Sequence, residues 1–127
     1  MAVLWQVEDE AERVLRERRR FRALVQAIAE PSSDVDAAEL IYGELVANTV
    51  RHARGAVEVR LERADTESPV LVVRDHGPGA GARSMPCARD PLAESGRGLE
   101  IVALLARRVA VEHPAGGGTE VRAVLPV

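Results

Sequence analysis

The spacing of apolar residues before residue 30 predicts a long N-terminal helix. Residues 8–29 are rich in charged side chains, and their apolar positions recur at the intervals of one helical face. These positions are Val14, Phe21, Leu24, Val25 and Ile28. Pro31 follows and would end the helix, because proline cannot continue the helical hydrogen bonds.

A second helix is predicted over about residues 34–53. Its apolar positions keep helical spacing, and Ser33 followed by Asp36 forms a weak capping box at its start. Gly55 is a suitable stop after its C-terminus. The apolar positions are Ala37, Leu40, Ile41 and Leu45.

The remaining chain alternates between strand and helix patterns. Val70–Val73 is a continuous apolar run, as expected of an interior strand. Three further strands are predicted from apolar alternation, at Val57, Val59 and Leu61, at Val109 and Val111, and at Val121, Ala123 and Leu125. A third helix is predicted from the helical spacing of Leu99, Val102, Leu105 and Ala106. The pattern predicts an α/β, or α+β, two-layer sandwich, with about four strands and the helices packed on one face.

Composition narrows the class of protein. The chain has 127 residues, 46% of them hydrophobic and 29% charged, which suits one globular domain spanning residues 1–127. No apolar stretch approaches the ~20 residues that cross a bilayer, and the N-terminus does not resemble a signal peptide. The single cysteine, Cys87, fits a reducing cytoplasm. The net charge of -3 offers no argument for nucleic-acid binding.

The chain contains no lysine, so all 17 basic residues are arginines. This excludes a phosphate-binding loop of the GxxxxGK[ST] kind, Schiff-base catalysis and the strand lysine of protein kinases. Arginine is then the only cationic side chain available for phosphate, and its planar fork suits that ligand.

Glu44, Asn48 and His52 follow one another at four-residue intervals in the second predicted helix. This spacing stacks them on one face. They form either a solvated polar stripe or the lining of a pocket, in which the Asn48 amide oxygen would be a hard ligand for Mg²⁺ and Glu44 could orient or deprotonate a nucleophile.

Three glycine-containing segments complete the candidate chemistry. Asp75 ends the interior strand and begins DHGPG, which is either an ordinary turn or a site where Gly77 and Gly79 admit a flat ligand. The segment 95–99, SGRGL, precedes the third helix and is either a linker or an anion site. GGGT, ending at Thr119, is a hairpin turn unless it joins that site.

Taken in order, ELVANTVRHA, DHGPG, SGRGL and GGGT resemble the ATP-binding signature of the superfamily of gyrase, chaperone, histidine-kinase and mismatch-repair ATPases. The resemblance runs from about residue 10 to 125. It implies a Bergerat fold, with a mixed, mainly antiparallel sheet and a lid loop over about residues 80–97. The free-standing domain, Glu-x-x-x-Asn followed by His-Ala, and the preceding helix are most similar to bacterial anti-sigma-factor serine kinases.

The resemblance also implies residue roles. Glu44 would be the catalytic carboxylate and Asn48 the Mg²⁺ ligand. Asp75 would bind the adenine amine, with Gly79 against the ring and Thr119 acting through a water. The other ATP-binding positions would be His52, Gly77, Ser95, Gly96, Arg97, Gly98 and Leu99.

The implied function is an ATP-dependent anti-sigma factor that phosphorylates a serine of an antagonist protein. The sigma factor, the antagonist and a second copy of the chain are the expected partners. An arginine cluster in the first helix would either meet an acidic partner or form a solvated face balanced by nearby carboxylates; its members are Arg16, Arg18, Arg19, Arg20 and Arg22.

Other functions remain open. DHGPGAG and the ending AGGGTEVRAVL are also similar to switch kinases of stressosome scaffolds. A detached histidine-kinase catalytic domain and an ATP-binding module without transferase activity are further alternatives. A gyrase-like or chaperone-like ATPase is disfavoured, because 127 residues leave no room for transducer domains.

Overall fold

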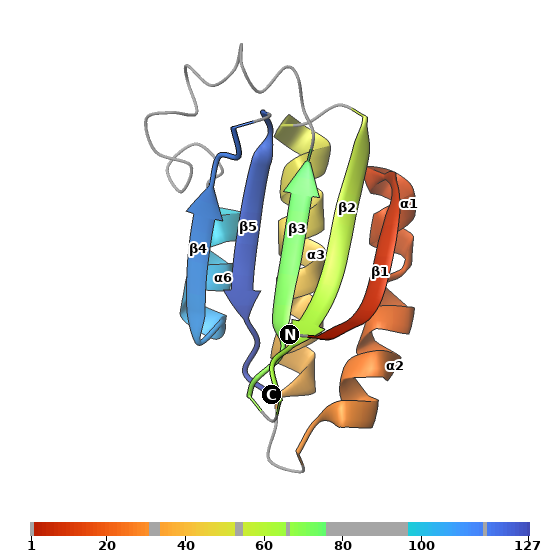
Figure 1. Cartoon of the computed structure of the whole chain (residues 1–127), viewed down its shortest axis with the longest axis vertical. Helices are drawn as coiled ribbons and strands as arrows, with labels where there is room; N and C mark the ends of the chain where they lie inside the picture. The colour runs from red at the N-terminus through yellow and green to blue at the C-terminus, as the bar shows by residue number, and fades with distance from the viewer. Residues whose placement is uncertain (1, 31–33, 53–54, 66, 76–96, 116) are drawn as a thin grey trace.

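The computed structural model describes residues 2–30, 34–52, 55–65, 67–75, 97–115 and 117–127. Strands and helices alternate along this part of the chain (Figure 1). In order they are β1 (Ala2–Glu10), α1 (Ala11–Arg16), α2 (Arg18–Ile28), α3 (Val35–His52), β2 (Ala56–Arg63), β3 (Val70–Asp75), α6 (Arg97–Leu105), β4 (Arg108–Glu112) and β5 (Thr119–Val124).

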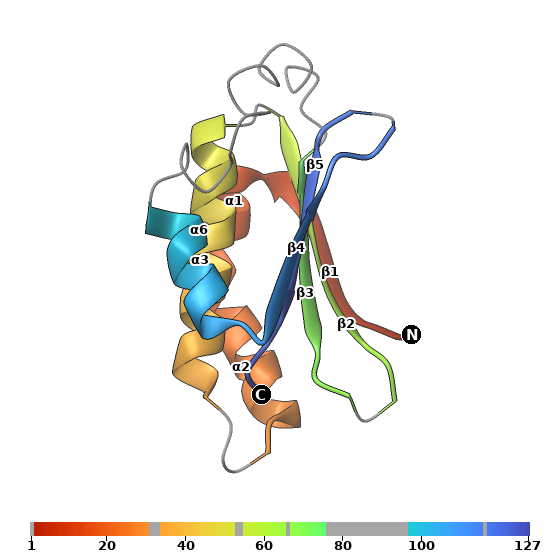
Figure 2. The same ribbon diagram turned by 90° about the vertical axis from the view of Figure 1, so that its left-hand side faces the viewer.

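The strands form one sheet in the order β1-β2-β3-β5-β4, and each described pairing is antiparallel. The helices cover one face of this sheet (Figure 2). The predicted two-layer α+β sandwich is therefore confirmed. The sheet has five strands rather than about four.

The fifth strand corrects the prediction of one helix over residues 8–29. Residues up to Glu10 belong to β1, which pairs with β2 from Ala2↔Arg63 to Glu10↔Ala56. Two helices follow, and Glu17 separates them. The apolar spacing was helical only from Val14 onward. The charged residues before it suit an exposed edge strand as well as a helix, so pairing with β2 decides between the two.

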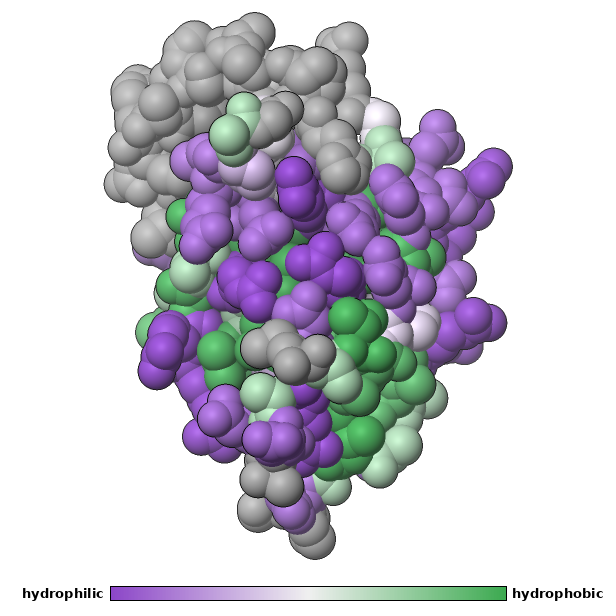
Figure 3. Space-filling model, in the orientation of Figure 1, coloured by the Kyte–Doolittle hydropathy of each residue, from purple (hydrophilic) through white to green (hydrophobic). Residues whose placement is uncertain are grey.

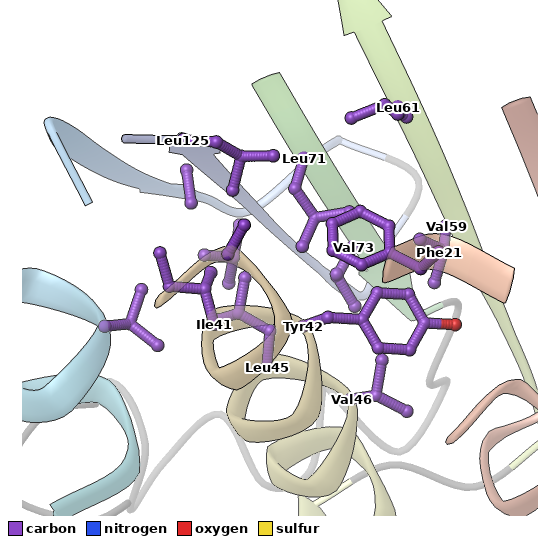
Figure 4. Close-up of a cluster of buried hydrophobic side chains, with 14 of the residues drawn as sticks. Phe21, Ile41, Tyr42, Leu45, Val46, Val59, Leu61, Leu71, Val73 and Leu125 are labelled. Carbon is purple, nitrogen blue, oxygen red and sulfur yellow. The ribbon is translucent and has the colours of Figure 1, made fainter. Parts of the chain in front are cut away.

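The core lies between the sheet and the helices, and it includes most of the predicted apolar positions (Figure 4). Val14, Phe21 and Val25 are buried, as is Ile41. Leu40 is an exception, because its side chain is 44% exposed on the outer side of α3.

The predicted second helix is confirmed as α3, but its cap differs from the prediction. The Asp34 carboxylate accepts a hydrogen bond from the Ala37 N–H at 2.9 Å, so Asp34 is the N-cap. Ser33 lies outside the described residues. Gly55 adopts a φ of 88° just before β2, a conformation that favours glycine.

The face of the sheet opposite the helices is a ladder of ion pairs, seen as a polar band in Figure 3. Glu62 accepts hydrogen bonds from Arg60 Nε at 2.8 Å and from Arg122 Nη2 at 2.9 Å. Both arginines flank Val72 across the sheet, and Val72 is only 1% exposed. The charged side chains therefore shield this valine from water. Among the described helices, none has the length and apolar character that a membrane span needs.

Candidate functional site

The site begins on α3, which carries Glu44 and Asn48 one helical turn apart. The helix runs without interruption from Val35 to His52, so the four-residue spacing of these two residues places them on one side of it. Both are half-buried. His52 ends the same helix, and its side chain lies outside the described structure. The predicted stripe thus forms for its first two members.

Asn48 has an unsatisfied acceptor. Its Oδ1 is buried, and it has no hydrogen-bond partner within the described residues. A buried acceptor without a hydrogen-bond partner destabilises the folded protein by about 1–3 kcal/mol. Such an atom is therefore a candidate for binding a ligand. A carboxamide oxygen is a suitable donor for Mg²⁺. The neighbouring Thr49 is also buried, but its hydroxyl donates to Val46 O at 2.6 Å and is satisfied within the helix.

Asp75 and Thr119 meet on neighbouring strands. They are direct partners in the β3–β5 register, although 43 residues separate them in the sequence. Asp75 is 9% exposed, and the alternation of β3 puts it on the side of Leu71 and Val73, which face the helices. The structure therefore brings together the two residues that the sequence resemblance assigned to adenine.

The glycine turn before Thr119 connects β4 to β5, which pair as a hairpin. Gly117 and Gly118 have φ values of 100° and 85°, which residues with a side chain rarely adopt. The prediction that GGGT forms a hairpin turn is thus correct. The turn is also compatible with a position in the candidate site, because it places Thr119 opposite Asp75.

These elements converge on one end of the molecule. In both Figures 1 and 2 the C-terminal end of α3, the end of β3 and the start of β5 lie at the same end. Asn48 lies in the last part of α3, Asp75 ends β3, and Thr119 begins β5. A hard oxygen ligand and a buried carboxylate thus border one region, between the helix layer and the sheet.

Several predicted positions lie outside the described residues: Gly77, Gly79, Ser95, Gly96 and the lid loop 80–97 apart from Arg97. Arg97 and Gly98 form the start of α6, and the side chain of Arg97 lies outside the described structure. Leu99 follows them with its side chain in the core, at 2% exposure. Any contact of Leu99 with a phosphate would therefore come from its backbone N–H.

The comparisons with known proteins agree with this fold. The family model described as a histidine kinase-like ATPase domain matches residues 7–125. The chain belongs to the histidine kinase-like ATPase domain family. No curated protein matches it in sequence. A solved structure, the mycobacterial sensor histidine kinase MprB, is similar with a TM-score of 0.53 and 21% identity, over 94% of this chain and 97% of that one. At this identity the likeness shows the fold.

Membership in the histidine kinase-like ATPase family supports ATP binding by this chain. The region bordered by α3, β3 and β5 is the candidate site for the nucleotide. The buried Oδ1 of Asn48, which has no partner among the residues that the structure describes, fits a Mg²⁺ ion that accompanies the nucleotide. The described residues hold no cluster of three or more histidine, cysteine or acidic side chains suited to a metal. Phosphate oxygens of the nucleotide and water molecules are the usual further ligands of Mg²⁺ in such a site.

Proposed function

We propose that the protein is an ATP-dependent anti-sigma factor and serine/threonine protein kinase, which binds a sigma factor and phosphorylates a serine of an antagonist protein. The observation that carries the kinase part is the placement of Glu44 one turn before Asn48 on α3. A carboxylate next to the site of Mg²⁺ and phosphate can act on an incoming hydroxyl group.

In the proposed reaction, the serine Oγ attacks the γ-phosphorus of ATP. The bond between that phosphorus and the β–γ bridging oxygen breaks, and ADP leaves with the electron pair. Glu44 accepts the hydroxyl proton. Arg97 and the backbone N–H groups at the start of α6 would stabilise the negative charge of the transferred group, since positioning and charge stabilisation supply most of the catalysis in phosphoryl transfer. Mg²⁺, held by Asn48, would offset the phosphate charge.

The anti-sigma part rests on the N-terminal unit β1–α1–α2, which directly precedes α3 in the sequence. Three arginines of its cluster already pair within the chain. Arg18 lies 3.3 Å from Glu39, Arg20 lies 3.4 Å from Glu17, and Arg22 lies 2.7 Å from both Asp36 and Glu39. These pairs favour a structural role for those three side chains. Arg16 and Arg19 form no ion pair with the described residues, and we propose them as the cluster members that meet an acidic partner.

Two alternatives use the same ATP site. A switch kinase would phosphorylate a scaffold protein instead of a sigma-factor antagonist, and a regulatory module would bind ATP without transferring phosphate. A homodimer is compatible with each of them. Phosphotransfer from labelled ATP separates the kinases from the module, and the identity of the phosphorylated protein separates the two kinases.

The test is capture from a lysate of the native host with the immobilised protein, with and without Mg-ATP. Asn48→Ala serves as the nucleotide-blind control, and mass spectrometry identifies the captured proteins. Each captured small protein is then purified and incubated with labelled ATP and either the wild type or Glu44→Ala. Phosphoserine mapping gives the modified residue.

The anti-sigma proposal predicts a sigma factor and a small antagonist whose balance on the column changes with Mg-ATP, and phosphoserine on the antagonist only with intact Glu44. Recovery of a scaffold or phosphatase without a sigma factor would favour the switch kinase. Nucleotide binding without any phosphotransfer would leave the regulatory module. Phosphohistidine on the chain itself would revive the histidine-kinase alternative.

A further inference from the structure

The only three aromatic residues of the chain meet in one cluster where the N-terminal unit packs on α3. Phe21 from α2 and Tyr42 from α3 stack with ring centroids 4.6 Å apart. Trp5 from β1 lies 6.3 Å from Phe21 and 6.2 Å from Tyr42. Figure 4 shows the Phe21 and Tyr42 rings side by side in the core. Tyr42 is therefore the residue of α3 that contacts the rings of β1 and α2.

The Tyr42 hydroxyl makes a specific bond to the N-terminal unit. It donates to Val14 O at 2.6 Å, and the residue is fully buried. Val14 O also accepts the Glu17 N–H at 3.1 Å, a three-residue spacing that marks the break between α1 and α2. Burial, together with the nearby Glu17 carboxylate, raises the pKa of Tyr42 well above its ordinary value. The hydroxyl therefore keeps its proton and remains a donor.

This bond lies on the same helix as the ATP site. Glu44 lies two residues after Tyr42, and Asn48 lies six residues after Tyr42. The distance from Tyr42 to Asn48 along the axis of α3 is therefore roughly 9 Å. A helix of 18 residues transmits a small shift or rotation along its length, because its backbone hydrogen bonds hold it as one body. The ring alone would fill the core, so the hydroxyl is the group that links α3 to the break at Glu17.

We propose that Tyr42 is a positioning residue, whose hydroxyl latches the β1–α1–α2 unit to α3 and so sets where Glu44 and Asn48 lie. Nucleotide at Asn48 and the seating of the N-terminal unit are then coupled in both directions. The inference rests on the proposed ATP site. It adds a route by which a partner bound to the N-terminal unit changes nucleotide affinity and phosphotransfer.

The test uses Trp5, which is the only tryptophan and lies in the cluster, so its emission reports on the latch. The full chain is titrated with Mg-ATP while Trp5 emission is recorded, and calorimetry measures nucleotide affinity independently. Tyr42→Phe removes only the hydroxyl. Thr49→Val is the matched control, because it removes another buried hydroxyl of α3 whose bond, to Val46 O, stays within that helix. Asn48→Ala blocks the nucleotide end of the route.

In the wild type, Mg-ATP is expected to shift Trp5 emission with the same dissociation constant as calorimetry. Tyr42→Phe is expected to weaken Mg-ATP binding about three- to tenfold, the size of one buried hydrogen bond, and to reduce the emission shift. Thr49→Val should lose stability but keep both readouts. Asn48→Ala should abolish the shift.

Any of three results would overturn the latch while leaving the proposed function intact. The first is tight Mg-ATP binding with no change in Trp5 emission. The second is equal Mg-ATP affinity in Tyr42→Phe and wild type. The third is a loss of affinity in Thr49→Val equal to that in Tyr42→Phe. Absence of any calorimetric Mg-ATP binding to the folded wild type would instead refute the ATP site itself, and the two failures are therefore distinguishable.

Discussion

Replacing Glu62 by glutamine tests the ion-pair ladder on the outer face of the sheet. The Glu62 side chain is only 10% exposed. One of its carboxylate oxygens accepts a hydrogen bond from Arg60 on the same strand, β2, and the other accepts one from Arg122 on β5. Glutamine has nearly the same shape but offers one acceptor oxygen, and its NH₂ group would face the other guanidinium. The change thus removes one charge-assisted bond and weakens the second.

The magnitude follows from these contacts. A hydrogen bond to a charged group contributes about 1.5–3 kcal/mol. The arginines keep other carboxylates, since Arg60 lies 3.2 Å from Glu58 and Arg122 lies 3.4 Å from Glu120. This partial compensation and the partial exposure of the arginines lower the expected loss. We expect Glu62→Gln to reduce the free energy of unfolding by about 1–2 kcal/mol at pH 7.

The pH dependence gives a second, independent signature. Burial acts to raise the pKa of Glu62, but hydrogen bonds from Arg60 and Arg122 outweigh it and hold that pKa below its ordinary value of 4.5. A lowered pKa in the folded state contributes stability that is present above the ordinary value and is lost as the pH falls through the folded one. The difference between wild type and Glu62→Gln should therefore be constant from pH 7 to about 5 and shrink below pH 4.5.

Urea denaturation at several pH values measures this difference, with equal m-values as the check that both proteins unfold in the same way. Glu67→Gln is the matched control, because it removes the charge of an exposed turn residue. A loss below about 0.3 kcal/mol at pH 7, or a difference that does not shrink in acid, would refute a stabilising role for the ladder.

Three further variants test the ATP site. Asn48→Ala should abolish Mg-dependent ATP binding, as measured by calorimetry. It should lower the free energy of unfolding by no more than about 1 kcal/mol, because the amide oxygen that is lost has no partner among the described residues. Retained Mg-dependence of ATP binding would exclude Asn48 as the ligand. Glu44→Ala should bind ATP within about threefold of wild type but lose phosphotransfer by roughly 10²–10⁴-fold in a labelled-ATP assay, and an equal loss of both would rule out its assigned role. Asp75→Asn should weaken ATP affinity about tenfold or more, since the carboxylate is exchanged for a neutral amide, and unchanged affinity in a fluorescent-nucleotide competition would remove Asp75 from the adenine site.

The sequence alone determined the elements whose signals are local. The helical spacing in α3 located the helix that carries Glu44 and Asn48, and alternation or continuous apolar runs located β2, β3, β4 and β5. The order of the four motifs pointed to the family that the chain belongs to. These signals survive in the sequence because each depends on residues within a few positions of one another.

Tertiary structure decided whatever depended on distant partners. Residues 2–10 form a strand because β2 provides an edge to pair with, whereas the sequence pattern places residues 8–10 at the start of a helix. The facing of Asp75 and Thr119 follows from the β3–β5 register, which motif order cannot supply. The unpaired Asn48 oxygen and the bond from Tyr42 to Val14 O likewise appear only when α3 packs against the sheet and the N-terminal unit. Burial and long-range pairing are properties of the packed chain, and no short stretch of sequence encodes them by itself.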